Sequence, residues 1–191
     1  MSLELTPVYA RLIAILCQGR GAAGELGADA TPRAIPAGYF RHTRGPLDDP
    51  ATPAAIFDRG LHVRWTSNRD GLGPNSSRYT MEDQVYGFDL CVGYLVGDAQ
   101  TLAVHKITVT ESATDAVQLA RQRALSDARR MKRALAFTEL TTGVLDAAGT
   151  AIIDVRQEGD VRFESTGAGR LICVQPFAVE AWVSDTDALT P

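Results

Sequence analysis

The sequence predicts one α+β domain: an antiparallel or mixed β-sheet with a long hairpin, two helices packed on one side, and a long irregular arm after the first helix. Three observations lead to this fold class. The predicted elements follow the order helix, arm, two strands, helix and three strands, and helices set apart from a mostly antiparallel sheet are typical of α+β domains. The 45% hydrophobic and 22% charged residues are close to the averages of folded soluble domains. The length of 191 residues fits one domain, which we expect over residues 1–183 with a flexible tail at 184–191.

The first predicted element is an amphipathic helix over about residues 6–18. Thr6 can cap the free amides of the first turn, and Pro7 suits the first helical position because it has no amide hydrogen to leave unpaired. The apolar side chains that share one helical face are Val8, Leu12, Ile15 and Leu16. Gly19 stands where a C-terminal cap is expected.

Residues 19–55 are rich in Gly, Ala and Pro and predict the long irregular arm. A segment of this length without regular structure is uncommon in a compact domain and usually carries a function or is disordered, so we interpret it as a contact arm. Residues 19–24 spell GxGxxG, but a dinucleotide site needs these glycines after a strand and before a helix. Here they follow a helix, so they predict a flexible helix exit and no nucleotide cofactor.

Two alternating runs predict the long antiparallel hairpin. One face of its first strand is formed by Leu61, Val63 and Trp65. The run over residues 86–96, with Phe88 on its apolar face, is the clearest strand pattern in the chain. The polar residues 66–83 between the two runs predict a wide loop at the hairpin tip.

A second helix is predicted over about residues 112–137, with Ser112 or Thr114 as its cap. The residues of its apolar stripe are mostly small, which would let the helix approach a sheet closely. They are Val117, Ala120, Ala124, Ala128, Met131 and Leu135.

Three strands then follow, at about residues 152–156, 161–164 and 170–183, separated by turn residues typical of hairpins. Pro176 lies in the last of them. Because proline has no amide hydrogen for the ladder, it predicts an edge position or a bulge at that point.

Charge and cysteine content exclude several classes of protein. The net charge of −4 gives no overall attraction to nucleic acid or to anionic lipid. Cys17, Cys91 and Cys173 form no CxxC pair, so we expect reduced, buried cysteines in a cytosolic setting and no disulfide framework. The sequence also predicts no signal peptide and no membrane-spanning segment.

No motif for catalysis or metal binding is found. His42, His62 and His105 have no second ligand at a spacing such as HxxxH, so we expect no metal site. The chain contains no GxSxG nucleophile motif. We therefore expect a protein that is not an enzyme and uses no cofactor.

The second helix carries the one charge feature above background. Between residues 121 and 133 six basic residues oppose only Asp127; the six are Arg121, Arg123, Arg129, Arg130, Lys132 and Arg133. Four more arginines lie in or near the hairpin and its loop, namely Arg59, Arg64, Arg69 and Arg78. Two interpretations of the helix stay open: a solvated face, or a surface that meets an acidic neighbouring subunit or passing DNA. The ten residues are candidate contacts with subunits, partners or DNA.

The order of elements resembles the tail terminator, or tail-completion, proteins of long-tailed bacteriophages and phage-like particles. The resemblance covers most of the chain. It rests on the N-terminal helix PVYARLIAIL (residues 7–16), the hairpin strand YGFDLCVGY (86–94), the Ala/Arg helix (124–135) and the closing strand FAVEAWV (177–183). The arm at residues 19–55 is longer than this family leads us to expect.

The resemblance implies a non-enzymatic virion protein of the phage tail or neck that is assembled in the host cytoplasm. Such proteins form homo-oligomeric rings, usually hexamers, which end the tail tube and join it to the head–tail connector or stopper protein. Sequence-independent contact with DNA in the channel is a further expectation, and contact with a membrane is not. The family has no catalytic residue, so none is carried over.

Two alternatives remain. The same element order also fits a tail tube subunit or another connector subunit. In a different class, the chain would be a small α+β enzyme or ligand-binding domain with a pocket under the arm and with His62 or His105 as proton carriers.

Overall fold

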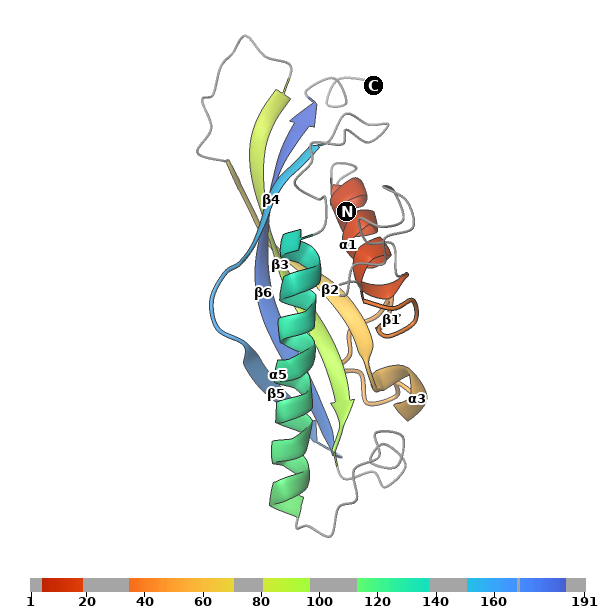
Figure 1. The fold of residues 1–191 in the computed structure, drawn as a ribbon. Coiled ribbons are helices and arrows are strands. Elements are labelled where there is room, and N and C mark those ends of the chain that lie inside the picture. Colours follow the sequence, from red (N-terminus) through yellow and green to blue (C-terminus); the bar gives the residue numbers. More distant parts are fainter. Residues whose placement is uncertain are drawn as a thin grey trace.

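The computed structural model describes residues 5–18, 35–70, 81–96, 113–137, 151–167 and 169–184. Within these residues it contains three helices and a mixed six-stranded sheet, which confirms the predicted α+β class (Figure 1). The helices are α1 (Leu5–Cys17), α3 (Ala54–Phe57) and α5 (Ala113–Phe137). The strands are β1 (Arg41–His42), β2 (Gly60–Asp70), β3 (Met81–Leu95), β4 (Ala151–Gln157), β5 (Arg162–Gly167) and β6 (Arg170–Ser184).

Strands β3 and β6 form the centre of the sheet and pair antiparallel along their whole length, from Met81↔Ser184 to Leu95↔Arg170. β2 pairs antiparallel with the other side of β3, and β1 adds a short parallel pair to β2. β4 and β5 share the remaining side of β6. The predicted long hairpin and the three closing strands are therefore confirmed, and β6 extends into the predicted tail as far as Ser184.

The hairpin strands are longer than predicted. β2 continues to Asp70 and β3 begins at Met81, so the prediction of a loop over residues 66–83 is wrong at both ends. The polar residues 66–70 join the sheet because β3 supplies partners for them after a bulge between Trp65 and Ser67. Gly87 fits this bulge, since a Cβ there would collide with the side-chain oxygen of Ser67.

Trp65 lies opposite Phe88, on the face that its alternation predicts, but its side chain is 51% exposed. β1 pairs only with Gly60 and Leu61, so among the described residues no strand flanks β2 beside Trp65. The indole N–H instead donates to the Ser67 carbonyl at 2.6 Å, across the bulge.

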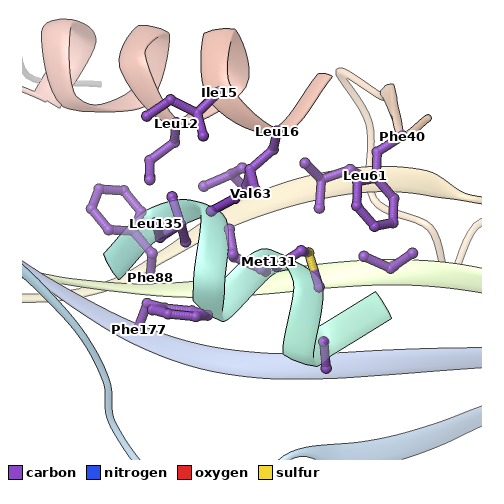
Figure 2. Packing of buried hydrophobic residues seen from close by; sticks show 14 of the residues in the cluster. Leu12, Ile15, Leu16, Phe40, Leu61, Val63, Phe88, Met131, Leu135 and Phe177 are labelled. Atoms are coloured by element: carbon purple, nitrogen blue, oxygen red, sulfur yellow. The ribbon is translucent and has the colours of Figure 1, made fainter. Parts of the chain in front are cut away.

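Helices α1 and α5 cover one face of the sheet, as predicted (Figure 1). Figure 2 shows where side chains from α1, α5 and the strands meet, with Phe88 and Phe177 beside Leu135. The alanines of the predicted α5 stripe are buried, which lets the helix lie close to the strands. A second, smaller cluster occupies the opposite face of the sheet; it contains Leu47, Phe57, Cys91, Ile172 and Val174.

The described part of the predicted arm is more ordered than expected. Residues 35–55 contain β1 and the start of α3, and their apolar side chains Ile35, Phe40 and Leu47 are buried. Arg170 holds this segment: it donates to the Thr52 carbonyl at 2.6 Å, and its guanidinium lies 4.9 Å from the centre of the Phe57 ring. Three apolar residues at such wide spacing give no periodic signal, which is why an irregular arm was predicted. Residues 19–34, with the GxGxxG sequence, lie outside the described residues.

Pro176 lies in a strand at the centre of the sheet, but the side of β6 that faces β4 and β5 is unpaired at this residue, so the predicted edge position holds locally. The ladder with β3 is regular at Asp89↔Pro176, without the alternative bulge. On the other side of β6, however, Pro176 falls between the residues that pair with β4 and those that pair with β5. The missing amide hydrogen is tolerated there because neither β4 nor β5 pairs with Pro176. Its carbonyl accepts a hydrogen bond from the Glu158 N–H at 3.0 Å.

All three cysteines are buried and unpaired, as predicted. Burial raises the pKa of Cys17 and of Cys173 to about 12, and that of Cys91 to about 11. The thiolate is the reactive form, so we expect no alkylation by iodoacetamide at pH 8 in the native protein. The same iodoacetamide treatment in guanidinium chloride should alkylate all three cysteines, and mass spectrometry counts the modified residues. Rapid alkylation of a native cysteine would contradict the packing described here.

Candidate functional site

A cleft of about 360 Å³ is lined by the described part of the arm, by the residues between α3 and β2, and by α5. Residues 36–39 and Arg41 line it from the arm, and Asp58, Arg59 and Arg123 complete the lining. The cleft thus brings together two of the predicted contact residues, Arg59 and Arg123, from positions far apart in the sequence. It lies against the arm, where the ligand-binding alternative placed a pocket.

Arg59 occupies the centre of the site in an unusual backbone conformation. Its φ is 55°, in the left-handed region that residues other than glycine seldom adopt. The neighbouring chain holds it there, because its N–H donates to the Gly93 carbonyl at 2.8 Å and its carbonyl accepts the Arg41 N–H at 2.9 Å. Such conformations cost about 1–3 kcal/mol and cluster at functional sites. The side chain of Arg59 contacts Asp127 and Tyr39.

Asp127 is the buried acid of the site, with 2% of its surface exposed. It accepts hydrogen bonds from the hydroxyls of Tyr39 at 2.6 Å and of Tyr94 at 3.1 Å. Its Oδ2 atom lies 3.4 Å from Arg59 Nε. Burial raises the pKa of Tyr94 well above its ordinary value, and the negative charge of Asp127 raises it further. The carboxylate therefore joins α5, β3 and the arm.

Tyr39 is clamped by two arginines. Arg59 donates to its hydroxyl at 2.7 Å and Arg130 at 2.9 Å, while their guanidinium carbons lie 4.0 and 5.2 Å from the ring centre. The hydroxyl thus accepts from two cations and donates to Asp127. Burial raises the pKa of Tyr39, and its hydrogen bond to Asp127 adds to the increase. The predicted contact residue Arg130 is therefore part of this network.

Arg123 forms a two-pronged ion pair with Asp58. Its Nη1 and Nη2 atoms lie 3.1 and 3.0 Å from the two carboxylate oxygens, and both side chains are mostly buried. The guanidinium also lies 5.3 Å from the centre of the Tyr94 ring. Bidentate pairs of this kind fix orientation as well as charge. The pair therefore fixes the end of α3 against α5.

The balance of charge around the cleft is positive. Four guanidinium groups, from Arg41, Arg59, Arg123 and Arg130, oppose the two carboxylates of Asp58 and Asp127. The buried Nε atoms of Arg59 and Arg123 have no hydrogen-bond acceptor among the described residues. Arg59 Nε has its 3.4 Å electrostatic contact with Asp127, but not the geometry of a hydrogen bond. The site is thus suited to binding and orienting an anion.

The predicted proton carriers are not at the cleft. His62 does not line it; its Nδ1 atom lies 3.4 Å from the Thr43 carbonyl. His105 lies outside the described residues. His42 contacts Tyr9 through Nε2 at 2.6 Å, and burial lowers its pKa. In the described part of the chain, no three His, Cys, Asp or Glu side chains gather as metal ligands.

Arg64 belongs to a second ionic cluster, on the opposite face of the sheet. It donates to the buried carboxylate of Asp89 at 2.7 Å, and Arg162 of β5 approaches the same oxygen at 3.3 Å. The hydrogen bond to Asp89 raises the pKa of Arg64. Arg64 thus has a partner within its own chain that links β2 to β3. Arg69 lies in β2, where only its backbone is described, and Arg78 lies outside the described residues.

The remaining predicted residues form what we call the basic face of α5: Arg121, Arg129, Lys132 and Arg133. All four are exposed and form no ion pair with any residue that the structure describes. At about 100° per residue they fall within an arc of about 120°. Leu125, which is 40% exposed, lies within the same arc. The basic residues of this helix thus divide into two groups, because Arg123 and Arg130 turn toward the cleft.

Five residues of the site were missed as functional residues: Tyr39, Arg41, Asp58, Tyr94 and Asp127. Only Asp127 had a local signal, since it is the one acid in a basic segment, beside the apolar stripe. Tyr94 lies in the run over residues 86–96, whose alternation predicts a strand and no functional role. Tyr39, Arg41 and Asp58 lie in or near an irregular segment whose sequence does not show what they pack against.

Comparison with known proteins identifies no relative of this chain. No family model matches the chain, and neither the curated proteins nor the solved structures contain a match. Among the described helices none is long and apolar enough to span a membrane. The cleft and the basic face of α5 are therefore the features of the described residues that bear on function.

Proposed function

We propose that this chain is a structural, ring-forming subunit that ends a phage tail tube and joins it to the head–tail connector. The observation that carries the proposal is the basic face of α5. Four exposed cations on one arc of a helix lack ion-pair partners among the described residues, although the chain as a whole has a net charge of −4. Such asymmetry favours a partner of opposite charge.

A second copy of the chain can supply that opposite charge. Acidic side chains gather on β4, β5, the turn between them and the adjoining part of β6; they are Asp154, Glu158, Asp160, Glu164 and Glu180. Arg156 neutralises part of this charge through its contacts with Asp154, Glu158 and Glu180. A contact between two different surfaces of identical subunits closes into a ring when each step is a fixed rotation. The basic face would then set the register between neighbours.

Reversing one charge on the basic face tests this proposal. We expect Arg133→Glu to weaken self-association by about tenfold or more, because like charges would then meet across the contact. Arg44→Glu is the matched control, since Arg44 is exposed, lies outside α5 and undergoes the same change of charge. Arg130 is unsuitable because its contact with Tyr39 would also be lost.

The measurement is the mass in solution by light scattering, over a range of protein and salt concentrations, with negative-stain imaging of larger species. Discrete rings of the wild-type chain, lost in Arg133→Glu and kept in Arg44→Glu, are the expected result. Stacked tubes in place of single rings would favour a tail tube subunit. Equal association of both variants would contradict the role given to α5.

The cleft favours a second candidate, a small ligand-binding domain. Its position against residues 36–41 agrees with a pocket under the arm. Its lining offers three cations, a tyrosine and the carboxylate of Asp58, which is paired with Arg123, and neither His62 nor a cysteine. This composition favours binding over acid–base catalysis.

A further inference from the structure

We propose that the cleft binds a small oxyanion with about two negative charges, either a phosphate group or a dicarboxylate. The inference concerns this site alone and does not depend on assembly into rings. It rests on the charge of the cleft, on the donors that its arginines present, and on the rigidity with which they are held.

The charge of the cleft selects for an anion. Its lining contains three guanidinium groups and one carboxylate. The buried Asp127 and the exposed Arg130 both contact the lining residue Tyr39 and add one charge of each sign. Asp58 compensates Arg123 and Asp127 compensates Arg59, so among the described residues the charges of Arg41 and Arg130 remain without a carboxylate partner. A ligand with two negative charges would neutralise them, whereas a cation or an apolar ligand would not.

The donors also fit an oxyanion. A guanidinium presents planar pairs of N–H groups that match the oxygens of carboxylates and phosphates. Arg123 already makes such a pair with Asp58, which shows how the site holds a carboxylate. Arg41 is exposed and lines the cleft, with one nitrogen bonded to the Ala55 carbonyl. We infer that Arg41 makes the first contact with an incoming anion.

The arrangement is fixed before a ligand arrives. Arg59 is held by its strained backbone, by Tyr39 and by Asp127, and Arg123 is held by Asp58. At the wall of the cleft, the Gly38 N–H bonds to the Cys17 carbonyl at 2.9 Å, which ties the arm to α1. Preorganised cations lose little conformational entropy on binding. The volume of about 360 Å³ also lies in the range of small-molecule sites.

Titration calorimetry with two probes, inorganic phosphate and succinate, tests the proposal at pH 7.5. Sodium chloride of equal ionic strength is the blank. We expect saturable binding of at least one probe with a stoichiometry of one per chain, and amide shifts in NMR spectra at residues 37–41 and 58–59. Tighter binding of phosphate would identify a phosphate ligand, and tighter binding of succinate a dicarboxylate.

Two matched variants locate the binding. Arg41→Gln should weaken it by about tenfold, since one charge-assisted contact is lost. Arg133→Gln removes the same charge from the basic face of α5 and should leave the affinity unchanged. Arg41→Lys keeps the charge but not the planar fork, so its affinity should lie between those of the wild type and Arg41→Gln; it also provides a second test if Arg41→Gln lowers the melting temperature.

Three results would overturn the proposal. One is the absence of saturable binding of both probes above the chloride blank. Another is an equal loss of affinity in Arg41→Gln and Arg133→Gln, which would assign the effect to overall charge. The third is a set of amide shifts confined to α5. None of these results depends on whether the chain forms rings, so failure of this proposal can be told from failure of the proposed function.

Discussion

Replacing Phe88 with alanine is expected to lower the free energy of unfolding by about 3–5 kcal/mol. Phe88 is 1% exposed and lies at the centre of the sheet, opposite Trp65 on β2 and Phe177 on β6. Its removal takes away buried apolar surface and leaves a cavity that β3, held on both sides, cannot close easily. Urea denaturation followed by circular dichroism measures the loss.

Leu125→Ala is the matched control for this experiment. Leu125 is a large apolar residue that is partly exposed on α5, so we expect its replacement to change stability by about 0.5 kcal/mol or less. A loss below about 1 kcal/mol for Phe88→Ala would show that the apolar face of β3 is packed differently from the arrangement in Figure 2.

Asp127→Ala is expected to cost a similar amount, about 3–5 kcal/mol, for an electrostatic reason. The substitution removes the acceptor of two tyrosine hydroxyls and the counter-charge of Arg59. The guanidinium of Arg59 and both tyrosine hydroxyls would remain mostly buried without their acceptor. Removing one partner of a buried ion pair is strongly destabilising because the other charge is left uncompensated. The measurement is again urea denaturation.

Two variants separate the causes of that loss. Asp127→Asn keeps an acceptor oxygen but no charge, so it should cost less than Asp127→Ala. It should also lower the pKa of Tyr39, because the charge of Asp127 contributes to the raised value. Asp160→Ala removes an exposed acid and should stay within about 0.5 kcal/mol of the wild type. Equal stability of Asp127→Ala and Asp160→Ala would contradict the network described here.

The sequence was informative where a local pattern repeats. The alternation in residues 86–96 and the 3.6-residue stripe of α5 both predicted elements that the structure confirms within a few residues. These patterns persist over many positions because each element has one face buried against a common core. Such a pattern can be recognised in the sequence without knowing which element packs against the buried face.

The sequence-based predictions are wrong where the structure of a segment depends on residues far away in the sequence. Residues 66–70 are polar and have no strand pattern; they extend β2 because β3 lies beside them. β1 has two residues, too few for any period. The sequence showed Asp127 as the one acid among the basic residues of the helix but could not show that Tyr39, from the arm, would reach it. The cleft is formed by single residues from separate segments. Its net charge depends on which of these residues lie close together in the fold, and no local sequence pattern shows this.

The central position of β6 has a consequence for how the chain acquires its structure. β6 is the last described strand in chain order, yet it pairs with β3, β4 and β5. During synthesis the β2–β3 hairpin and α5 emerge first, and the edge of β3 stays unpaired until β6 arrives. Closure over so long a separation slows folding, and an unpaired strand edge is prone to aggregate. We therefore expect the sheet to form late and in one cooperative step, with the chain depending most on chaperones just before β6 leaves the ribosome.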